Sequence, residues 1–440
     1  MTYVFPLLII LAANDFFYLI DYSGPGDSQD LGIPIILIGL IYHVFIKRSD
    51  IRPLNNFFTW YIFFYLLLVL SQVSVAAFNY SQSIMDGIFA GRKQIYYLAF
   101  PIFLLALNEP NKARNFMKAL SMLAFILILL SFVHYGLGIT VFQGRFATEG
   151  SGLSERGGMV RVMLPGMNIV IIGLLWQFWS YLRENRLLSV NLAMFLVTTG
   201  GLMARLTRGR IIAVSAVLLL MMVSRKRYGM LAAVAAIVLM VVVANLMFGS
   251  AENPIVYAFT SAISDVTETE GTWSGRVQQV IAAWDAFVSS FATGTGGMVI
   301  GSDLKAESSL LEAIAFEADL GYWVFIKFFG YWGILFLGGM IGGFYWYVLR
   351  CGKLGSADDM AQFAIYHFIC ILISMITITY LTKAGGIVMV CLTWALIVQS
   401  AQMAMAERSS KKTVSAESMD MASGSKTLGI ADIEDRDRLY

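Results

Sequence analysis

Charged side chains are scarce in this chain. Asp, Glu, Lys and Arg make up 14% of the 440 residues, whereas a soluble globular domain carries about 25%. Hydrophobic residues make up 58%, and the mean hydropathy is +0.71. A water-soluble protein of this composition would expose too much apolar surface, so the composition excludes a soluble enzyme and indicates a membrane protein. The net charge of +2 gives no reason to expect a nucleic acid partner.

Cysteine and histidine are rare as well, with three residues of each. The cysteines have no CxxC spacing, so they predict neither a metal site nor a disulfide. The histidines have no HxxxH or HxH spacing, and we interpret each as structural. No metal and no other cofactor is expected. The residues concerned are Cys351, Cys370, Cys391, His43, His134 and His367.

Long apolar runs, each near the ~20 residues that cross a bilayer, are what the chain has instead. They predict an all-α polytopic membrane protein of about twelve transmembrane helices. The first run has no basic residues before it, so we expect a retained span rather than a cleaved signal peptide. A short run at 320–329 is either re-entrant or part of the tenth helix. The expected spans are 3–20, 32–47, 57–78, 93–107, 115–138, 163–182, 188–204, 210–224, 228–248, 329–349, 362–382 and 384–404.

Basic residues follow every second span, and cytoplasmic loops of membrane proteins carry an excess of Lys and Arg. A multi-pass topology with both termini in the cytoplasm places every cluster on that side. The clusters are Lys47, Arg48 and Arg52; Lys112, Arg114 and Lys118; Arg183 and Arg186; Arg225, Lys226 and Arg227; and Arg350 and Lys353.

The chain then divides into a transmembrane domain over 1–404 and a disordered cytoplasmic tail over 405–440, which is polar and rich in Ser, Lys and Asp. A large outer loop lies within the first, over 249–319. From Ser274 its apolar residues recur at helical spacing, which predicts a helix on the membrane surface or over the mouth of the bundle. Glycines at 294, 296 and 297 are expected to end it, and a second short helix is expected over 306–318.

Several basic residues fall on the outer side, where they work against the charge bias of membrane insertion. Arginine offers a planar fork that matches phosphate oxygens, so the cluster suits the pyrophosphate of a lipid carrier. The alternative is that these side chains reach lipid headgroups or pair with nearby carboxylates. For Arg208 and Arg210, between two short spans, we favour the phosphate interpretation. The whole set is Arg92, Lys93, Arg145, Arg156, Arg161, Arg205, Arg208, Arg210 and Arg276.

Carboxylates of the outer loop are candidates for proton transfer. Glu307 shares a helical face with apolar residues, which suits a general base with a raised pKa, or a carboxylate favoured by a helix N-terminus. Asp319 lies at the end of the same stretch. Asp15 lies inside the first span, where its residue type alone does not separate a functional site from a helix–helix hydrogen bond.

Four motifs follow one another in the order seen in a known family. They are LTRGRIIAV (206–214), WSGRVQQVIAAWDAF (273–287), SSFATGTGG (289–297) and the stretch from Glu307 to Leu335. Together with the topology they resemble the O-antigen polymerase and O-antigen ligase superfamily, which includes exopolysaccharide polymerases. The resemblance covers 205–335, about a third of the chain.

The resemblance implies a metal-independent glycosyltransferase of the lipid-sugar-using (GT-C-like) architecture in the bacterial inner membrane. Its donor would be an undecaprenyl-pyrophosphate-linked glycan, with a chain-length regulator and a flippase as partners in the pathway. Glu307, Asp319, Arg208 and Arg276 would be catalytic. Arg205, Arg210, Arg161, Arg92, Trp273 and Trp284 would bind pyrophosphate or sugar rings. For the tryptophans, a place at the membrane interface is an equal alternative.

Ligases of this superfamily carry a histidine at the exit of the large loop. Here the comparable stretch is Glu307-Ser308-Ser309, which favours a polymerase of repeat units. A ligase to another acceptor, a lipid-linked oligosaccharide flippase and a noncatalytic assembly subunit remain as alternatives. A flippase often has an internal repeat and charges along a central path. The charges of this chain gather on the outer side instead.

Overall fold

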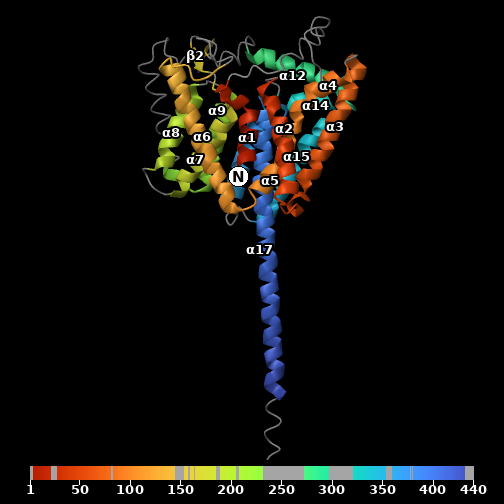
Figure 1. Cartoon of the computed structure of the whole chain (residues 1–440), viewed down its shortest axis with the longest axis vertical. Coiled ribbons are helices and arrows are strands. Elements are labelled where there is room, and N and C mark those ends of the chain that lie inside the picture. Colours follow the sequence, from red (N-terminus) through yellow and green to blue (C-terminus); the bar gives the residue numbers. More distant parts are fainter. Residues whose placement is uncertain are drawn as a thin grey trace, which may run out of the picture.

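The computed structural model is a bundle of α-helices with one short β-hairpin (Figure 1). It describes residues 3–20, 27–80, 83–143, 153–156, 159–162, 164–184, 189–204, 208–230, 272–296, 321–352, 359–376, 378 and 380–431.

In the first half of the chain, α-helices alternate with short helical turns, which are 3-10 helix except for a π-helical turn at Tyr42–Ile46. The α-helices are α1 (Val4–Ala13), α2 (Gly32–Ile41), α3 (Phe57–Tyr80), α4 (Ile84–Gly91), α5 (Ala99–Ala106), α6 (Pro110–Gly136), α7 (Met167–Glu184), α8 (Val190–Ala204) and α9 (Arg208–Ser224). The short turns are η1 (Asp15–Tyr18), η2 (Ser28–Leu31), η3 (Tyr42–Ile46), η4 (Arg52–Leu54) and η5 (Arg92–Leu98). Strands β1 (Leu153–Arg156) and β2 (Met159–Val162) pair antiparallel.

The second half contains α12 (Thr272–Ser289), α14 (Tyr322–Phe329), α15 (Tyr331–Cys351), α16 (Asp359–Ser374) and α17 (Ala384–Ala431). Five segments of the described chain are long and apolar enough to cross a membrane: Ser28–Ile46, Phe57–Asn79, Pro110–Gly136, Tyr331–Cys351 and Ala384–Ser409. Shorter apolar helices accompany them. The chain is therefore a helical membrane protein, as the composition predicted. Every expected span overlaps a helix except 228–248, most of which lies outside the described residues.

Helix α17 passes through the middle of the bundle (Figure 1). It packs against α1, α5, α15 and α16, and its spanning segment is buried on every side. A helix that is apolar all round belongs in a core. The Trp394 ring stacks on Phe58 with 4.5 Å between centroids.

The same helix continues far beyond the bundle, to Ala431 (Figure 1). The sequence predicted a disordered tail over 405–440, whereas the structure has helix over 405–431. The cause is that the polar segment carries many good helix formers, Ala, Met, Glu and Lys, and no proline. It also extends a helix already formed, so it avoids the unfavourable nucleation step. Residues 432–440 lie outside the described part.

We call the end of the bundle from which α17 emerges the tail end, and the opposite end, where α12 lies, the α12 end (Figure 1). Several members of the expected cytoplasmic clusters lie at the tail end. Arg350 contacts Met405 on the emerging part of α17, and the Gln402 side chain donates to the Pro53 carbonyl beside Arg52. Arginines that end or begin α6, α7 and α9 meet at the start of α16.

The amphipathic helix expected in the outer loop is α12. One face carries Ala283 and Phe287, which are buried. The opposite face exposes Ile281, Trp284 and Val288. The 320–329 run forms a separate helix, α14, because the backbone at Gly330 is not helical and interrupts the helix before α15 begins. The short helix expected over 306–318 lies outside the described residues.

A turn at Gly294–Gly296 joins α12 to the rest of the bundle through backbone contacts. The Thr295 amide donates to the Lys327 carbonyl at 3.0 Å, and the Tyr331 amide donates to the Phe291 carbonyl at 2.8 Å. Gly294 and Gly296 both have positive φ, at 70° and 77°. A Cβ at Gly294 would lie 2.1 Å from the Phe328 carbonyl oxygen, and one at Gly296 would lie 2.7 Å from the Ala76 amide nitrogen. Only glycine fits this close approach.

Replacing Gly296 with alanine should therefore loosen α12. Left-handed backbone and overpacking together should cost about 2–4 kcal/mol, measured as a lower midpoint of thermal unfolding in detergent. Gly338→Ala is the matched control, because a Cβ there meets no atom within 4 Å. Equal midpoints for the two variants would contradict the assignment of this turn.

Candidate functional site

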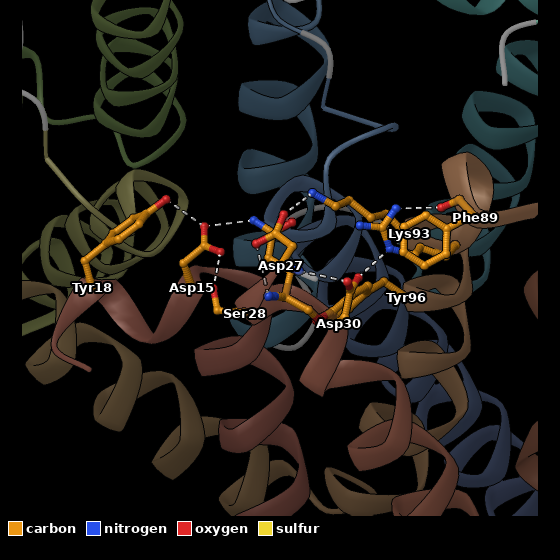
Figure 2. Close-up of polar contacts among 10 residues, drawn as sticks. Asp15, Tyr18, Asp27, Ser28, Asp30, Phe89, Lys93 and Tyr96 are labelled. Atoms are coloured by element: carbon orange, nitrogen blue, oxygen red, sulfur yellow. Dashed lines mark hydrogen bonds and ion pairs between the residues drawn. The ribbon is translucent and has the colours of Figure 1, made fainter. Parts of the chain in front are cut away.

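A cluster of charged and polar side chains lies at the α12 end, around η1, η2 and η5 (Figure 2). It contains three carboxylates and two cations, all partly buried: Asp15, Asp27, Asp30, Arg92 and Lys93. The cluster lies near the start of α17, because the Gln94 side chain contacts the Thr382 carbonyl just before that helix. We call this group the polar cluster.

The backbone that carries Asp15 is left-handed. The four residues of η1 have φ between 48° and 56°, a conformation that costs an L-residue about 1–2 kcal/mol. Asp tolerates it best, whereas Phe and Tyr adopt it rarely. Strain of this kind is kept only where the surroundings enforce it, and such residues concentrate at functional sites.

Burial of Phe17 offsets part of this strain. Its ring is fully buried, which contributes about 1.5–3 kcal/mol. The space for the ring is left by Gly166, whose own φ is +65°. A Cβ at Gly166 would lie 2.6 Å from the Phe17 ring. The position of Asp15 therefore depends on a glycine about 150 residues away in the sequence.

Three donors hold the Asp15 carboxylate (Figure 2). The Tyr18 hydroxyl donates at 3.0 Å, the Ser28 hydroxyl at 2.6 Å and the Gln29 side-chain amide at 2.9 Å. A carboxylate accepting several hydrogen bonds has a fixed orientation and can still accept a proton on a remaining lone pair. Asp15 is half-buried, so one side of it remains open.

A capping box begins η2 and orients the other two carboxylates. The Asp27 side chain accepts from the Gln29 backbone N–H, and the Asp30 side chain accepts from the Asp27 backbone N–H at 3.0 Å. Such reciprocal caps satisfy backbone donors at a helix start. A cap explains why the two aspartates lie three residues apart, directly before the apolar run of α2.

The cations come from η5. The Arg92 Nε lies 2.6 Å from the Asp30 carboxylate, and the Lys93 Nζ lies 2.7 Å from Asp27. Lys93 and Tyr96 lie on the same side of a 3-10 helix, which has three residues per turn. The Tyr96 hydroxyl donates to the Gln29 carbonyl. Arg92 also lies over the Phe89 ring, 3.9 Å from its centroid.

The Lys93 contact sets the titration of Asp27. Burial alone would raise the pKa of this carboxyl, but the hydrogen bond and charge of Lys93 outweigh it and hold the pKa below its ordinary value of 3.8. Asp27 is thus an anion at neutral pH, which favours a structural ion pair at this position.

The residues predicted from sequence fall at several places. Arg92 contacts Asp30. Arg210 on α9 is half-buried and lies near Cys370 of α16, so the two arginines lie in different surroundings. Trp284 lies half-exposed on α12, where its ring meets Trp323 edge-on. Of four others, the structure describes only the backbone: Arg208 begins α9, Arg276 and Trp273 lie in the first turns of α12, and Arg161 lies in β2 opposite Ser154. The last three lie outside the described residues: Arg205, Glu307 and Asp319.

Sequence reasoning noted Asp15 without assigning it and missed Asp27 and Asp30. The spacing Asp-x-x-Asp before an apolar run is a signal for a helix cap and could have been found. The left-handed turn at 15–18 had no signal, because Phe-Phe-Tyr is not a turn sequence. Among the described residues no group of three or more His, Cys, Asp or Glu side chains is arranged to hold a metal ion.

Gly166→Ala should displace Phe17 and with it the Asp15 turn. We expect a loss of about 2–4 kcal/mol from left-handed backbone and overpacking, seen as a lower unfolding midpoint in detergent. Gly200→Ala, in a helix where a Cβ meets nothing within 4 Å, should leave the midpoint unchanged or raise it slightly. A Gly166→Ala midpoint equal to wild type would show that the turn does not need this space.

The Asp27–Lys93 pair should make stability depend on pH. Because the folded pKa of Asp27 is lowered, the contribution is present above the unfolded value of 3.8 and is lost as the pH falls through the folded value. The difference in unfolding midpoint between wild type and Lys93→Gln should therefore shrink between pH 6 and pH 3. The exposed Lys118→Gln serves as control. A difference that grows on acidification would contradict the assignment.

No protein-family model, no curated protein and no solved structure matches this chain.

Proposed function

We propose that the chain polymerises undecaprenyl-pyrophosphate-linked oligosaccharide repeat units into a surface or secreted polysaccharide, at the periplasmic face of the bacterial inner membrane. The proposal rests on the order of the four motifs between 206 and 335, on the helical membrane fold and on the polar cluster. The topology assumed is the multi-pass one of about twelve spans, with both termini in the cytoplasm. The tail end is then cytoplasmic and the α12 end periplasmic.

The observation that carries the proposal is the polar cluster itself. Ionisable side chains inside membrane spans are expensive and by default indicate a functional site, and Asp15 falls inside the first expected span. Here a carboxylate held by three donors lies in a strained turn, at the same end of the bundle as α12. That helix carries Arg276 and Trp273 of the second motif.

The reaction is a glycosyl transfer. A sugar hydroxyl of a new lipid-linked repeat unit attacks the anomeric carbon of the growing lipid-linked chain. The bond from that carbon to the pyrophosphate oxygen breaks, and the pyrophosphate leaves with the electron pair. A carboxylate takes the hydroxyl proton. Guanidinium groups stabilise the charge that develops on the leaving group, which is the electrostatic mode of catalysis.

The residues divide by chemistry. Glu307 and Asp319 are the candidates for the base from sequence, and Asp15 is the candidate from the structure. Arg208 and Arg276 stabilise the leaving pyrophosphate. The remaining basic residues and the two tryptophans bind the pyrophosphate and the sugar rings: Arg205, Arg210, Arg161, Arg92, Trp273 and Trp284. The flippase and the chain-length regulator of the same pathway would be the partners, with the bilayer as solvent.

Deleting the gene in its own host should leave single repeat units in place of long chains, measured on a polysaccharide gel. Arg276→Ala should reproduce this loss, because one electrostatic contact to a developing charge contributes about 10²–10³ in rate. Asp15→Asn should do the same if Asp15 is the base. Arg408→Gln, an exposed arginine on the tail, is the control.

Membrane abundance of each variant is measured by immunoblot, so that a folding defect is not taken for lost chemistry. Untouched chain lengths in an abundant Arg276→Ala variant would remove that arginine from the site. Long chains that stay on the lipid carrier after deletion would favour the ligase. Repeat units that accumulate on the cytoplasmic side would favour the flippase.

A further inference from the structure

A second charged group lies at the tail end, away from the polar cluster. Arg114 near the start of α6, Arg183 at the end of α7 and Arg225 just after α9 all face Asp359, the first residue of α16. Four helices therefore contribute one side chain each. We call this group the arginine cluster.

Its charges are unequal. Among the described residues three guanidinium groups share one carboxylate, so positive charge is in excess. Only Arg183 is close, with its Nη2 2.7 Å from Asp359 Oδ2. The nearest nitrogens of Arg114 and Arg225 lie at 3.9 and 3.6 Å, which is beyond good hydrogen-bond distance. Asp359 therefore makes one close ion pair, with Arg183, and Arg114 and Arg225 are too far from it for a good hydrogen bond.

Two donors of the cluster are buried without an acceptor in the described structure, the Nε atoms of Arg114 and Arg225. Burying a guanidinium N–H without a hydrogen-bond acceptor is costly. The side chains are nevertheless about one-third exposed, at 35% and 33%. The two side chains are therefore partly open to the surrounding phase, although their Nε atoms are enclosed.

The arginines are also held in place. Arg225 lies over the Trp179 ring, 4.2 Å from its centroid, and donates to the Gln362 side chain at 3.2 Å. Arg227, two residues on, donates to the Leu182 carbonyl at 3.2 Å. A preorganised fork of this kind loses little freedom on binding, which is what distinguishes a site from scattered surface charge.

We propose that the arginine cluster binds a phosphate group, and that Arg114 and Arg225 supply the donors. A phosphate adds several charged acceptor oxygens to the distant Asp359 carboxylate and the Gln362 side chain that these guanidinium groups already face. Asp359 stays on Arg183 and keeps the helices together. The phosphate comes either from an anionic lipid headgroup, since the cluster lies at the ends of membrane helices, or from a free ion.

The test uses the full-length protein in neutral detergent. Dioleoylphosphatidylglycerol, dioleoylphosphatidylcholine and inorganic phosphate are each titrated, and bound lipid is counted by native mass spectrometry beside the unfolding midpoint. We expect phosphatidylglycerol to bind and to raise the midpoint. Arg225→Gln and Arg114→Gln should each weaken that binding by about tenfold, the equivalent of one charge-assisted hydrogen bond. Arg114→Lys should recover part of it, and Arg408→Gln should bind as wild type does.

The titrations distinguish a lipid headgroup from a free phosphate ion. Binding of phosphatidylglycerol with no effect of inorganic phosphate identifies a lipid headgroup, and an equal effect of inorganic phosphate identifies a free ion. Equal binding of both lipids with no effect of phosphate would overturn the proposal, and so would loss of binding in Arg408→Gln as large as in Arg225→Gln. Arg114→Gln guards against misfolding, because this arginine makes the longest contact with Asp359 and contributes least to holding the helices.

Discussion

A helix buried on all sides needs neighbours on all sides, and α17 imposes this condition on the bundle. Its spanning segment has no exposed face, so α1, α5, α15 and α16 must surround it. The aromatic packing follows from the same condition. Trp394 is covered by Phe58, and Tyr97 lies beside it with 6.1 Å between ring centroids. Helices that cover α17 bring their own ends together: the polar cluster lies after α1 and before α5, and Asp359 of the arginine cluster begins α16.

The polar cluster and the arginine cluster differ in their ratio of acidic to basic side chains. At the α12 end, three carboxylates accompany two cations, and both ion pairs are short. At the tail end, three arginines meet one carboxylate, and two of the contacts are long. The first arrangement holds a strained turn and a fixed carboxylate, which suits chemistry. The second leaves donors available, which suits binding.

Most of the helices could be predicted from the sequence, because a membrane span is a property of one continuous segment. The run 57–78 shows this, since it became α3 almost unchanged. The common side of Arg114, Arg183 and Arg225 was also predictable, because charge bias acts on each loop separately. What could not be predicted depends on contacts between distant residues. The left-handed turn at Asp15 exists because Phe17 finds space at Gly166, and no local pattern records that. The helical course of 405–431 depends on the upstream part of α17, which has already formed the helix that the polar residues continue.

The candidate site divides along the same line. Arg92 was predicted from its place outside the expected cytoplasmic clusters, but its partner Asp30 was not, because the two are joined only by the fold. Asp15 was visible as an anomaly in an apolar run. Its three donors come from Tyr18, Ser28 and Gln29. Two of these, Ser28 and Gln29, lie in the next helical stretch, η2, and a single span read by itself cannot supply them.

The unbroken course of α17 has a geometric consequence outside the membrane. Each residue of an α-helix turns the chain by about 100° and advances it by about 1.5 Å. The orientation of the tail about its axis is therefore fixed by the packing of Trp394 in the core, and its reach beyond Ser409 is roughly 30 Å. A single residue inserted near Glu407 would turn everything beyond it by more than a quarter of a circle and leave the bundle untouched. A rotation of α17 inside the bundle would also turn the emerging segment, because one continuous helix joins the two.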